Sequence, residues 1–545
     1  MKISETLKTN EDIHIQVLII GSGYGGSVLA ARLAPLYPTG EVLVAERGKE
    51  FARGDFPEKL TEAALQIRSP LAPLGLFDFN SFRDLDVLVA NGLGGTSLIN
   101  AAVMLRANKD VFLSNRWPQN ITFDKLKPFY EKVENILAVK PLWDEKDFIQ
   151  NNIPAKDLEK KDYRERMPSA RPRLLKTELF EKTAQSVLEA DLKIKKVPLA
   201  INIDGVESGS QNMYGVVQNK CRQCGNCVTG CNINAKNTLA MNYLPLAKKH
   251  GARLVTQLEV LSIQKTIGHL KKYKVTALAT VNKSTKSSVT IYADNVFLSA
   301  GVLGTLKILF QSQKEGLSLS SKLGSFISGN ADTFSLSALA NQKTSAAGFS
   351  STSKDFNLET GPTITAAIDL RDGANGKLLQ EGAVPSALTS PGPDANRSMV
   401  WLSMGTDQAE GQAVTKPNGS LHIQWPQSGF QKEILEARKI FSDFSKKLGS
   451  VHVENPREAL GFFKNLGSVP ISVHPLGGAI ISDSEKTGVT NEFGQVWNPD
   501  ENLHDGFFIV DGSMIPTSLG ANPSLTIAAL AERTADHFIQ QKGSV

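Results

Sequence analysis

The sequence predicts a two-domain α/β protein, with a parallel-sheet domain built from separate pieces of the chain and an inserted α+β domain that contains an antiparallel sheet. An uninterrupted apolar run at 17–20, typical of a strand buried on both faces, leads into a glycine-rich turn and a helix. A second apolar strand at 295–300 leads in the same way into Gly301 and an apolar helix. Residues 330–465 carry alternating stretches rich in Ser and Thr, which indicate a sheet with loops.

The bulk properties indicate a globular protein that is not built to bind nucleic acid. The chain has 545 residues, 41% of them hydrophobic, and a net charge of +5 from 60 basic and 55 acidic side chains. No dense Lys/Arg stripe is present, so we expect no nucleic-acid partner. Residues 1–15 lack a secretory signal, and no run of apolar residues is long enough for a transmembrane segment. We therefore expect a cytoplasmic protein.

The first strand, turn, helix and second strand form a unit that binds dinucleotides in many proteins. The turn at 21–26 has the spacing G-x-G-x-x-G. Its first glycine permits a tight turn, its second lets backbone approach a pyrophosphate, and its third lets the helix pack closely on the strand. Glu46 ends the next strand, at 41–46, where a carboxylate accepts hydrogen bonds from a ribose diol and repels a 2′-phosphate. The unit therefore predicts a dinucleotide other than NADP.

The remaining elements follow from apolar runs and from glycine or proline signals. We expect a helix at 238–248 that kinks or restarts at Pro245, because proline has no N–H to donate within a helix. A last helix begins after Asn522-Pro523 and ends near Gln541. Further strands are predicted at 254–256, 260–263, 275–278, 289–292 and 295–300.

These elements divide the chain into two discontinuous domains. Segments with glycine loops and parallel-strand patterns fall at 1–120, 200–325 and 466–545, and we assign them to the cofactor-binding domain. Segments 121–199 and 326–465 lack such loops and are assigned to the inserted, substrate-binding domain.

Further motifs determine which dinucleotide is expected. They lie at 91–100, 298–305, 474–478, 511–516 and 520–523. In sequence and order they resemble the glucose-methanol-choline (GMC) oxidoreductases near their cholesterol-oxidase branch, whose G-x-G-G-x-S-x-x-N motif lies against a flavin. The resemblance spans both ends and the middle of the chain. It implies a Rossmann-like FAD-binding domain of GMC type and oxidation of a small-molecule alcohol by hydride transfer to N5 of FAD.

The resemblance also implies a set of FAD-binding residues. Family members that tether FAD covalently carry a histidine where this chain has Ile99, so we expect non-covalent FAD. The residues expected to contact FAD are Gly21, Gly23, Tyr24, Gly25, Gly26, Glu46, Arg47, Gly92, Gly94, Gly95, Thr96, Ser97, Asn100, Val260, Ala300, Gly301, Gly304, Asp511, Gly512, Asn522 and Pro523.

His474 and Asn522 are the expected catalytic residues. His474 begins the run His-Pro-Leu-Gly-Gly, in which the resemblance assigns the histidine to the substrate hydroxyl. Imidazole suits this role because it exchanges a proton near neutral pH. Asn522 stands where the last helix begins, and a helix N-terminus aimed at the flavin stabilises its anionic reduced form.

The sequence departs from the steroid-acting cholesterol oxidases at one position. Those enzymes carry a glutamate in a Pro-x-Gly-Leu-Glu run that supports double-bond isomerisation. The nearest local match, at 385–389, ends in Thr389, and Glu381 lies nearby without being the aligned residue. The departure argues against a steroid substrate and more strongly against isomerase activity. The expected substrate is a sterol or another bulky apolar alcohol.

All four cysteines, Cys221, Cys224, Cys227 and Cys231, fall in one short segment. The spacing C-x2-C-x2-C-x3-C is that of bacterial ferredoxin ligands, apart from Asn232 where ferredoxins have proline. This spacing favours a four-iron, four-sulfur cluster; structural zinc and unmetallated thiols stay open as alternatives. A cluster would pass electrons from the reduced flavin to a quinone or an electron-carrier protein, whereas oxygen is the acceptor of an oxidase.

Two other functions remain open. FAD-dependent lyases and a decarboxylase share the family fold, and a redox-sensing or electron-transfer flavoprotein could use the cysteine segment as its active feature. Bleaching of the flavin by an alcohol separates alcohol oxidation from both.

Overall fold

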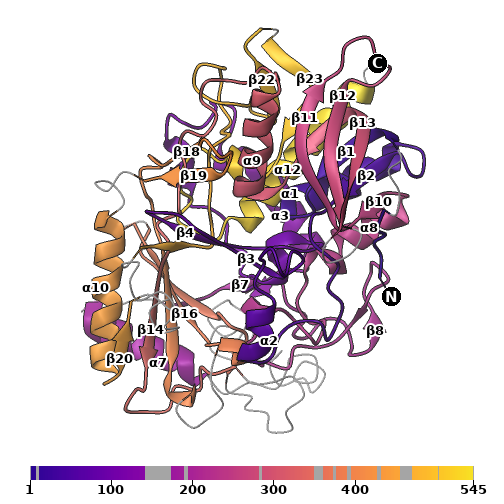
Figure 1. The fold of residues 1–545 in the computed structure, drawn as a ribbon. Coiled ribbons are helices and arrows are strands. Elements are labelled where there is room, and N and C mark those ends of the chain that lie inside the picture. The colour runs from indigo at the N-terminus through magenta and orange to yellow at the C-terminus, as the bar shows by residue number, and fades with distance from the viewer. Residues whose placement is uncertain are drawn as a thin grey trace.

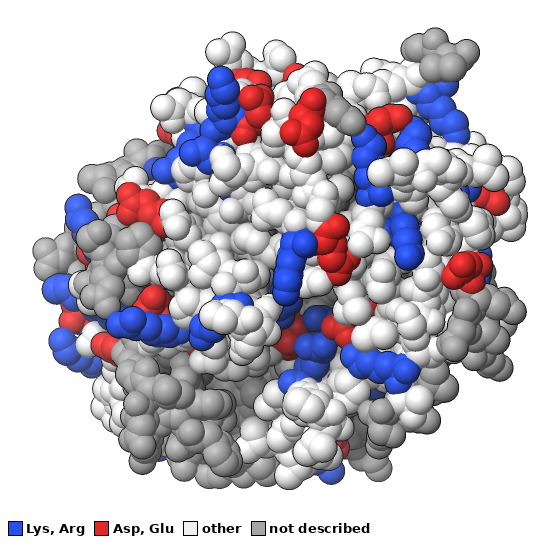
Figure 2. Space-filling model, turned by 45° about the horizontal axis from the view of Figure 1, so that its top comes forward, with Lys and Arg blue, Asp and Glu red and all other residues white. Residues whose placement is uncertain are grey.

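The fold was determined as a computed structural model. It describes residues 2–7, 12–141, 174–188, 194–280, 285–348, 360–371, 376–388, 395–425, 431–454, 469–500 and 502–543. Within these ranges, no helix is both long and apolar enough to cross a membrane. On the described surface shown in Figure 2, basic and acidic side chains are interspersed, without a broad area of one charge.

The N-terminal strand lies inside a mixed eight-stranded sheet. Its order is β10-β2-β1-β13-β12-β11; β23 also pairs with β13, and β22 pairs with β23. The pairs β10–β2, β2–β1, β1–β13 and β13–β23 are parallel, whereas β11, β12 and β13 run antiparallel. The strands are β1 (Ile13–Ile20), β2 (Val42–Ala45), β10 (Arg253–Val255), β11 (Leu258–Lys265), β12 (Tyr273–Thr280), β13 (Lys286–Leu298), β22 (Gln495–Asn498) and β23 (Asn502–Ile509).

Both faces of this sheet are covered, as its continuous apolar strands predict. Val17 and Ile19 pack in one core with the helices α1, α3, α8 and α12, whereas Leu18 and Ile20 pack in a second core with α9 and the β11–β12 strands. These helices are α1 (Tyr24–Leu33), α3 (Phe123–Ile136), α8 (Tyr243–Lys249), α9 (Gly301–Lys314) and α12 (Ser524–Gly543).

The second large sheet has six antiparallel strands in the order β20-β14-β17-β16-β15-β6. Rings from α7 and α10 cover one of its faces, where Phe180, Phe441 and Phe444 surround Trp401. Figure 1 shows α10 and α7 on the outer side of this sheet. The elements are β6 (Ile194–Lys196), β14 (Thr333–Ala338), β15 (Ala366–Asp369), β16 (Leu378–Gly382), β17 (Met399–Met404), β20 (Val451–Val453), α7 (Leu175–Leu188) and α10 (Gln431–Lys447).

A small three-stranded sheet, β3-β4-β21, lies between the two large sheets (Figure 1). Its strands are β3 (Phe77–Ser81), β4 (Asp86–Ala90) and β21 (Ile471–Ser472), and β21 leads directly to His474. The other short elements are α2 (Leu60–Leu65), β5 (Lys140–Pro141), β7 (Pro198–Leu199), β8 (Ser210–Gln211), β9 (Val217–Gln218), β18 (Gln412–Thr415) and β19 (Leu421–Gln424).

The predicted fold class, a Rossmann-like α/β domain with an antiparallel sheet inserted, is confirmed, although some elements differ. The strands predicted at 289–292 and 295–300 are one strand, β13, because its pairing with β12 continues through Ala293. The helix predicted at 238–248 restarts at Tyr243, which puts Pro245 in the first turn of α8. Helices α7 and α10 were not predicted.

Two pieces assigned to the inserted domain pack on helices that cover the eight-stranded sheet. Helix α3 packs on α12, and the hairpin β18–β19 packs on α9. The helices on which they pack are far away in the sequence, and local sequence patterns do not indicate such distant contacts. The domain boundaries stay a prediction.

Candidate active site

Steric contacts explain the glycines of the first turn. At Gly21 the backbone has φ +95°, and an added Cβ would lie 2.2 Å from the carbonyl oxygen of Ser299. At Gly25 a Cβ would lie 1.7 Å from the carbonyl oxygen of Val510. At Gly23, by contrast, nothing lies within 4 Å of an added Cβ. The turn is therefore packed tightly on the sheet while its middle stays open, as a backbone that receives a pyrophosphate requires.

The second glycine loop packs directly on the first. A Cβ at Gly95 would lie 2.8 Å from Cα of Gly23. Ser22 joins the two loops, because its Oγ accepts from the Gly94 amide at 2.9 Å and donates to Glu46 Oε2 at 2.6 Å. Gly26 packs on Gly21, and Ser97 Oγ donates to the Gly94 carbonyl at 2.7 Å. The predicted motifs of FAD binding thus form one cradle.

Glu46 and Arg47 lie beside this cradle with protein partners of their own. The Glu46 carboxylate accepts from Ser22 and from the Gly48 amide, which leaves one of its acceptor sites for a ribose hydroxyl. Arg47 pairs with Asp78 at 2.6 Å. Burial alone would raise the pKa of Asp78, but Arg47 and Arg68 hold it below its ordinary value.

The other residues expected at the cofactor lie around the same place. Asn100 donates to the Tyr24 hydroxyl at 2.8 Å, and burial raises the pKa of that hydroxyl. Leu258 donates from its amide to the Glu46 carbonyl at 2.9 Å, which brings Val260 on β11 toward Glu46.

Asp511 caps the motif before Gly512, and burial raises the pKa of its carboxyl. Thr305 Oγ1 donates to it at 2.5 Å. Since Thr305 follows Ala300, Gly301 and Gly304 at the start of α9, this bond joins two of the predicted motifs. Gly92 and Thr96 belong to the second glycine loop, and Pro523 directly precedes α12.

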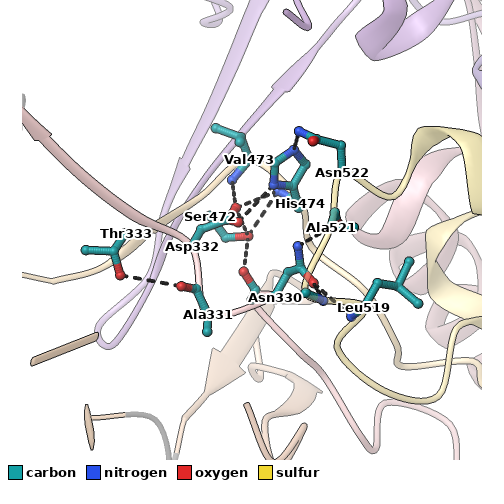
Figure 3. A network of polar contacts seen from close by, with 12 residues as sticks. Asn330, Ala331, Asp332, Thr333, Ser472, Val473, His474, Leu519, Ala521 and Asn522 are labelled. Atoms are coloured by element: carbon teal, nitrogen blue, oxygen red, sulfur yellow. Dashed lines mark hydrogen bonds and ion pairs between the residues drawn. The ribbon is translucent and has the colours of Figure 1, made fainter. Parts of the chain in front are cut away.

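His474 and Asn522, predicted from separate motifs, meet in the structure (Figure 3). Nε2 of His474 lies 3.4 Å from Nδ2 of Asn522. Nδ1 of His474 lies 2.8 Å from Oδ1 of Asp332, which is 1% exposed. Because a carboxylate only accepts hydrogen bonds, this contact assigns the imidazole proton to Nδ1 and makes Nε2 the basic atom. The base therefore points to Asn522.

Asp332 was not predicted, and neither was Asn330, although together they hold both of the residues that were predicted to be catalytic. The second oxygen of Asp332 accepts from the amides of Val473 and His474. Asn330 holds the loop before Asn522, since it accepts from the amides of Leu519 and Gly520 and donates to the Ala521 carbonyl. Figure 3 shows residues 330–332 between the loop that carries His474 and the loop that carries Asn522. An Asn-x-Asp sequence directly before a strand was the only local signal.

The residues discussed for isomerisation do not place a carboxylate beside His474. Thr389 lies outside the described residues. Glu381 is on β16, wholly buried, and pairs with Lys176 at 2.8 Å.

None of the four cysteines forms a disulfide bond, and all four line a single pocket. Burial, together with the neighbouring cysteines, raises the pKa of Cys224 to about 12. Within the described residues, no group of three or more His, Cys, Asp or Glu side chains is placed to hold a metal ion. The metal role predicted for the cysteines therefore stays a prediction.

Lys236 connects the cysteine pocket to the second glycine loop. Its buried Nζ donates to the carbonyls of Leu98 at 2.8 Å, Asn100 at 3.0 Å and Cys227 at 2.8 Å. Burial lowers the pKa of Lys236 to about 8, so the amine stays mostly charged at neutral pH. One buried cation thus contacts both the second glycine loop and the cysteine segment.

Comparison with known proteins identifies the family. Two family profiles, both described as GMC oxidoreductase, match residues 16–170 and 194–318 and residues 432–531. A cholesterol oxidase of Acinetobacter baumannii is 27% identical, covering 96% of this chain and 94% of its own. A cholesterol oxidase of Mycobacterium tuberculosis (strain ATCC 25618 / H37Rv) is 26% identical, covering 95% and 90%.

Solved structures agree on the fold. A pyridoxine 4-oxidase from Mesorbium loti has a TM-score of 0.60 at 15% identity, with 96% of this chain and 99% of the other covered. A formate oxidase of Aspergillus oryzae has a TM-score of 0.62 at 13% identity, with 97% and 98% covered. The chain belongs to the GMC oxidoreductase family and is an FAD-dependent oxidoreductase that acts on alcohols.

Proposed function

We propose that the protein oxidises the hydroxyl group of a bulky apolar alcohol, with His474 as the base. The proposal rests on the consecutive contacts from Asp332 to His474 and from His474 to Asn522. Asp332 keeps the proton on Nδ1, so Nε2 is free to take the hydroxyl proton of the substrate. FAD, when bound, supplies the hydride acceptor.

Asn522 has a separate role in this proposal. Its Nδ2 faces Nε2 of His474, so its N–H group can donate to the substrate oxygen as that oxygen loses its proton. Both residues are mostly buried, with 14% of the His474 side chain and 8% of Asn522 exposed. Exclusion of water strengthens the interactions of the substrate oxygen with His474 and with Asn522.

A sterol is the substrate class that we propose, because the relatives that align over nearly the whole chain are named cholesterol oxidases. Oxygen is the proposed acceptor, since these relatives and both structural neighbours are named oxidases. FAD is proposed to be non-covalent because Ile99 has no nucleophilic atom to bind it. Acid precipitation should then release the flavin into the supernatant. The cytoplasmic location stays a prediction.

Anaerobic mixing with substrate tests the function. The flavin absorbance of the purified protein should bleach with a sterol, and oxygen should restore it. His474→Ala should slow bleaching by roughly 10²- to 10⁴-fold. His14→Ala, which removes an exposed histidine, is the matched control and should bleach at the normal rate. Bound flavin that no alcohol bleaches would instead favour a lyase or an electron-transfer protein.

A second proposal concerns the cysteine segment, which we propose to bind a 4Fe–4S cluster. A cluster takes its thiolates from around a space and not from around one point, and the four thiols line one pocket. Lys236 favours an anionic group there: its described contacts are to three neutral carbonyls, and a buried cation is stabilised by a nearby negative charge. Electron transfer from the flavin through this cluster stays a hypothesis.

Metal analysis of anaerobically purified protein tests the cluster. About four iron and four sulfide ions per chain are expected. Cys227→Ser should lower both while FAD remains bound. Zinc in place of iron, or protein with neither metal, would contradict the proposal without affecting alcohol oxidation.

A further inference from the structure

Strand β16 directs two adjacent polar side chains to opposite faces of the six-stranded sheet. Glu381 pairs across the strands with Trp401, which packs with rings of α7 and α10. Gln380 pairs with Leu402, which packs in the core shared with the cofactor-binding half. Glu381 therefore faces the outer helices, and Gln380 faces the active site.

The carboxylate of Glu381 is fully engaged on its own side. It pairs with Lys176 at 2.8 Å and accepts from Thr177 and Thr365, and none of the Lys176 or Glu381 side chain is exposed. Of these two side chains, only Gln380 is thus directed to His474 and Asn522.

Gln380 contacts Asn522 directly. Its Nε2 donates to Oδ1 of Asn522 at 3.3 Å, and Nδ2 of Asn522 lies 3.4 Å from Nε2 of His474. The Asn522 amide is therefore held at both ends. A donor at its oxygen fixes which end faces the base.

Packing alone does not account for a glutamine at this position. Gln380 is wholly buried, and its Oε1 has no hydrogen-bond partner among the described residues. A buried polar atom without a partner destabilises the folded state, and a methionine would fill similar space without that cost. The amide must then contribute something other than stability.

We propose that Gln380 is a positioning residue that orients the Asn522 amide, so that its N–H group and not its carbonyl faces His474 and the substrate oxygen. This inference rests on the proposed roles of His474 and Asn522. The N–H group of Gln380 is the essential part of its side chain. Only a hydrogen-bond donor at this position favours the orientation of Asn522 in which Oδ1 faces Gln380.

Two variants test the donor. Gln380→Met should reduce flavin roughly 10- to 100-fold more slowly, with substrate KM little changed and with thermal stability equal to or above wild type. Gln380→Glu should be equally slow when its carboxylate is ionised, since it then attracts Nδ2 of Asn522. As the pH falls and the carboxyl gains a proton to donate, its rate relative to wild type should rise. The relative rate of Gln380→Met should not change with pH.

Ser335→Ala is the matched control. Ser335 is a buried residue of the same sheet whose Oγ also has no partner among the described residues, but it pairs with Trp401 and so faces away from Asn522. It should reduce flavin at the wild-type rate. A wild-type rate in Gln380→Met, equal pH profiles for the two Gln380 variants, or failure of both to fold would overturn the inference. Failure of wild-type protein to bleach with any alcohol would instead overturn the proposed function.

Discussion

The proposed role of His474 as the base depends on one buried carboxylate. Asp332 accepts at Oδ1 from the imidazole and at Oδ2 from the amides of Val473 and His474. The same residue thus fixes both the backbone that carries the histidine and the tautomer of its ring. A base that is already in the required tautomer needs no proton rearrangement when substrate binds.

Asp332→Asn should therefore lower kcat by roughly 10²- to 10⁴-fold. The asparagine carbonyl can still accept from the two amides, but its NH₂ group donates to Nδ1, which moves the imidazole proton to Nε2. The rate of anaerobic flavin reduction measures the effect. Ser472→Ala removes a hydroxyl that contacts the same carboxylate without changing the tautomer, and should cost much less. Equal rates for Asp332→Asn and wild type would show that His474 is not the base.

At the scale of elements, the first glycine turn combines tight packing with an open centre. Gly25 touches the end of β23 through the Val510 carbonyl, whereas Gly23 has free space on its side-chain side. Gly25 is therefore needed for the packing of α1, whereas Gly23 leaves the space that the predicted pyrophosphate site requires.

Comparing Gly23→Ala with Gly25→Ala distinguishes an effect on folding stability from an effect on FAD binding. Gly25→Ala forces a methyl group to 1.7 Å from a backbone oxygen, so we expect a lower melting temperature and little bound FAD. Gly23→Ala should fold with a normal melting temperature, because its φ of −67° suits alanine, but it should bind FAD more weakly. Thermal unfolding and flavin titration of the apoprotein measure both effects. Normal FAD affinity in Gly23→Ala would place the pyrophosphate elsewhere.

At the scale of the molecule, the candidate active site combines residues next to elements of both large sheets. Asp332 directly precedes β14 of the six-stranded sheet, whereas Asn522 stands before α12, which covers the eight-stranded sheet. The site is complete only when both are packed together. The buried pair Lys176–Glu381 fastens α7 to the six-stranded sheet on the opposite side.

Lys176→Met should destabilise the whole protein by about 3–5 kcal/mol, because it leaves the Glu381 charge buried without its partner. Denaturant unfolding at a fixed FAD concentration measures the loss. Replacing both residues, as in Lys176→Met with Glu381→Leu, should recover most of the stability, since no lone charge remains. If the double variant were as unstable as the single one, the packing of Lys176 and not its charge would be the cause.

The family resemblance indicated the pair His474 and Asn522. The sequence by itself indicated the glycine loops, the positions of the main strands along the chain and the start of the last helix. Each of these rests on neighbouring residues: a glycine needed where backbones touch, an apolar run buried on both faces, a proline at a helix start. Their physical causes act over a few residues, so a short stretch of sequence is enough to indicate them. The assignment of Gly21 and the strand before it follows from such local causes.

Only the tertiary structure decided which side chains contact the proposed catalytic pair. Asp332 and His474 are 142 residues apart, and so are Gln380 and Asn522. Neither Asp332 nor Gln380 stands in a motif, and Gln380 and its neighbour Glu381 point to opposite faces of β16. Which face meets the cofactor-binding half depends on how the two sheets pack, and that packing is the sum of many weak contacts between distant segments.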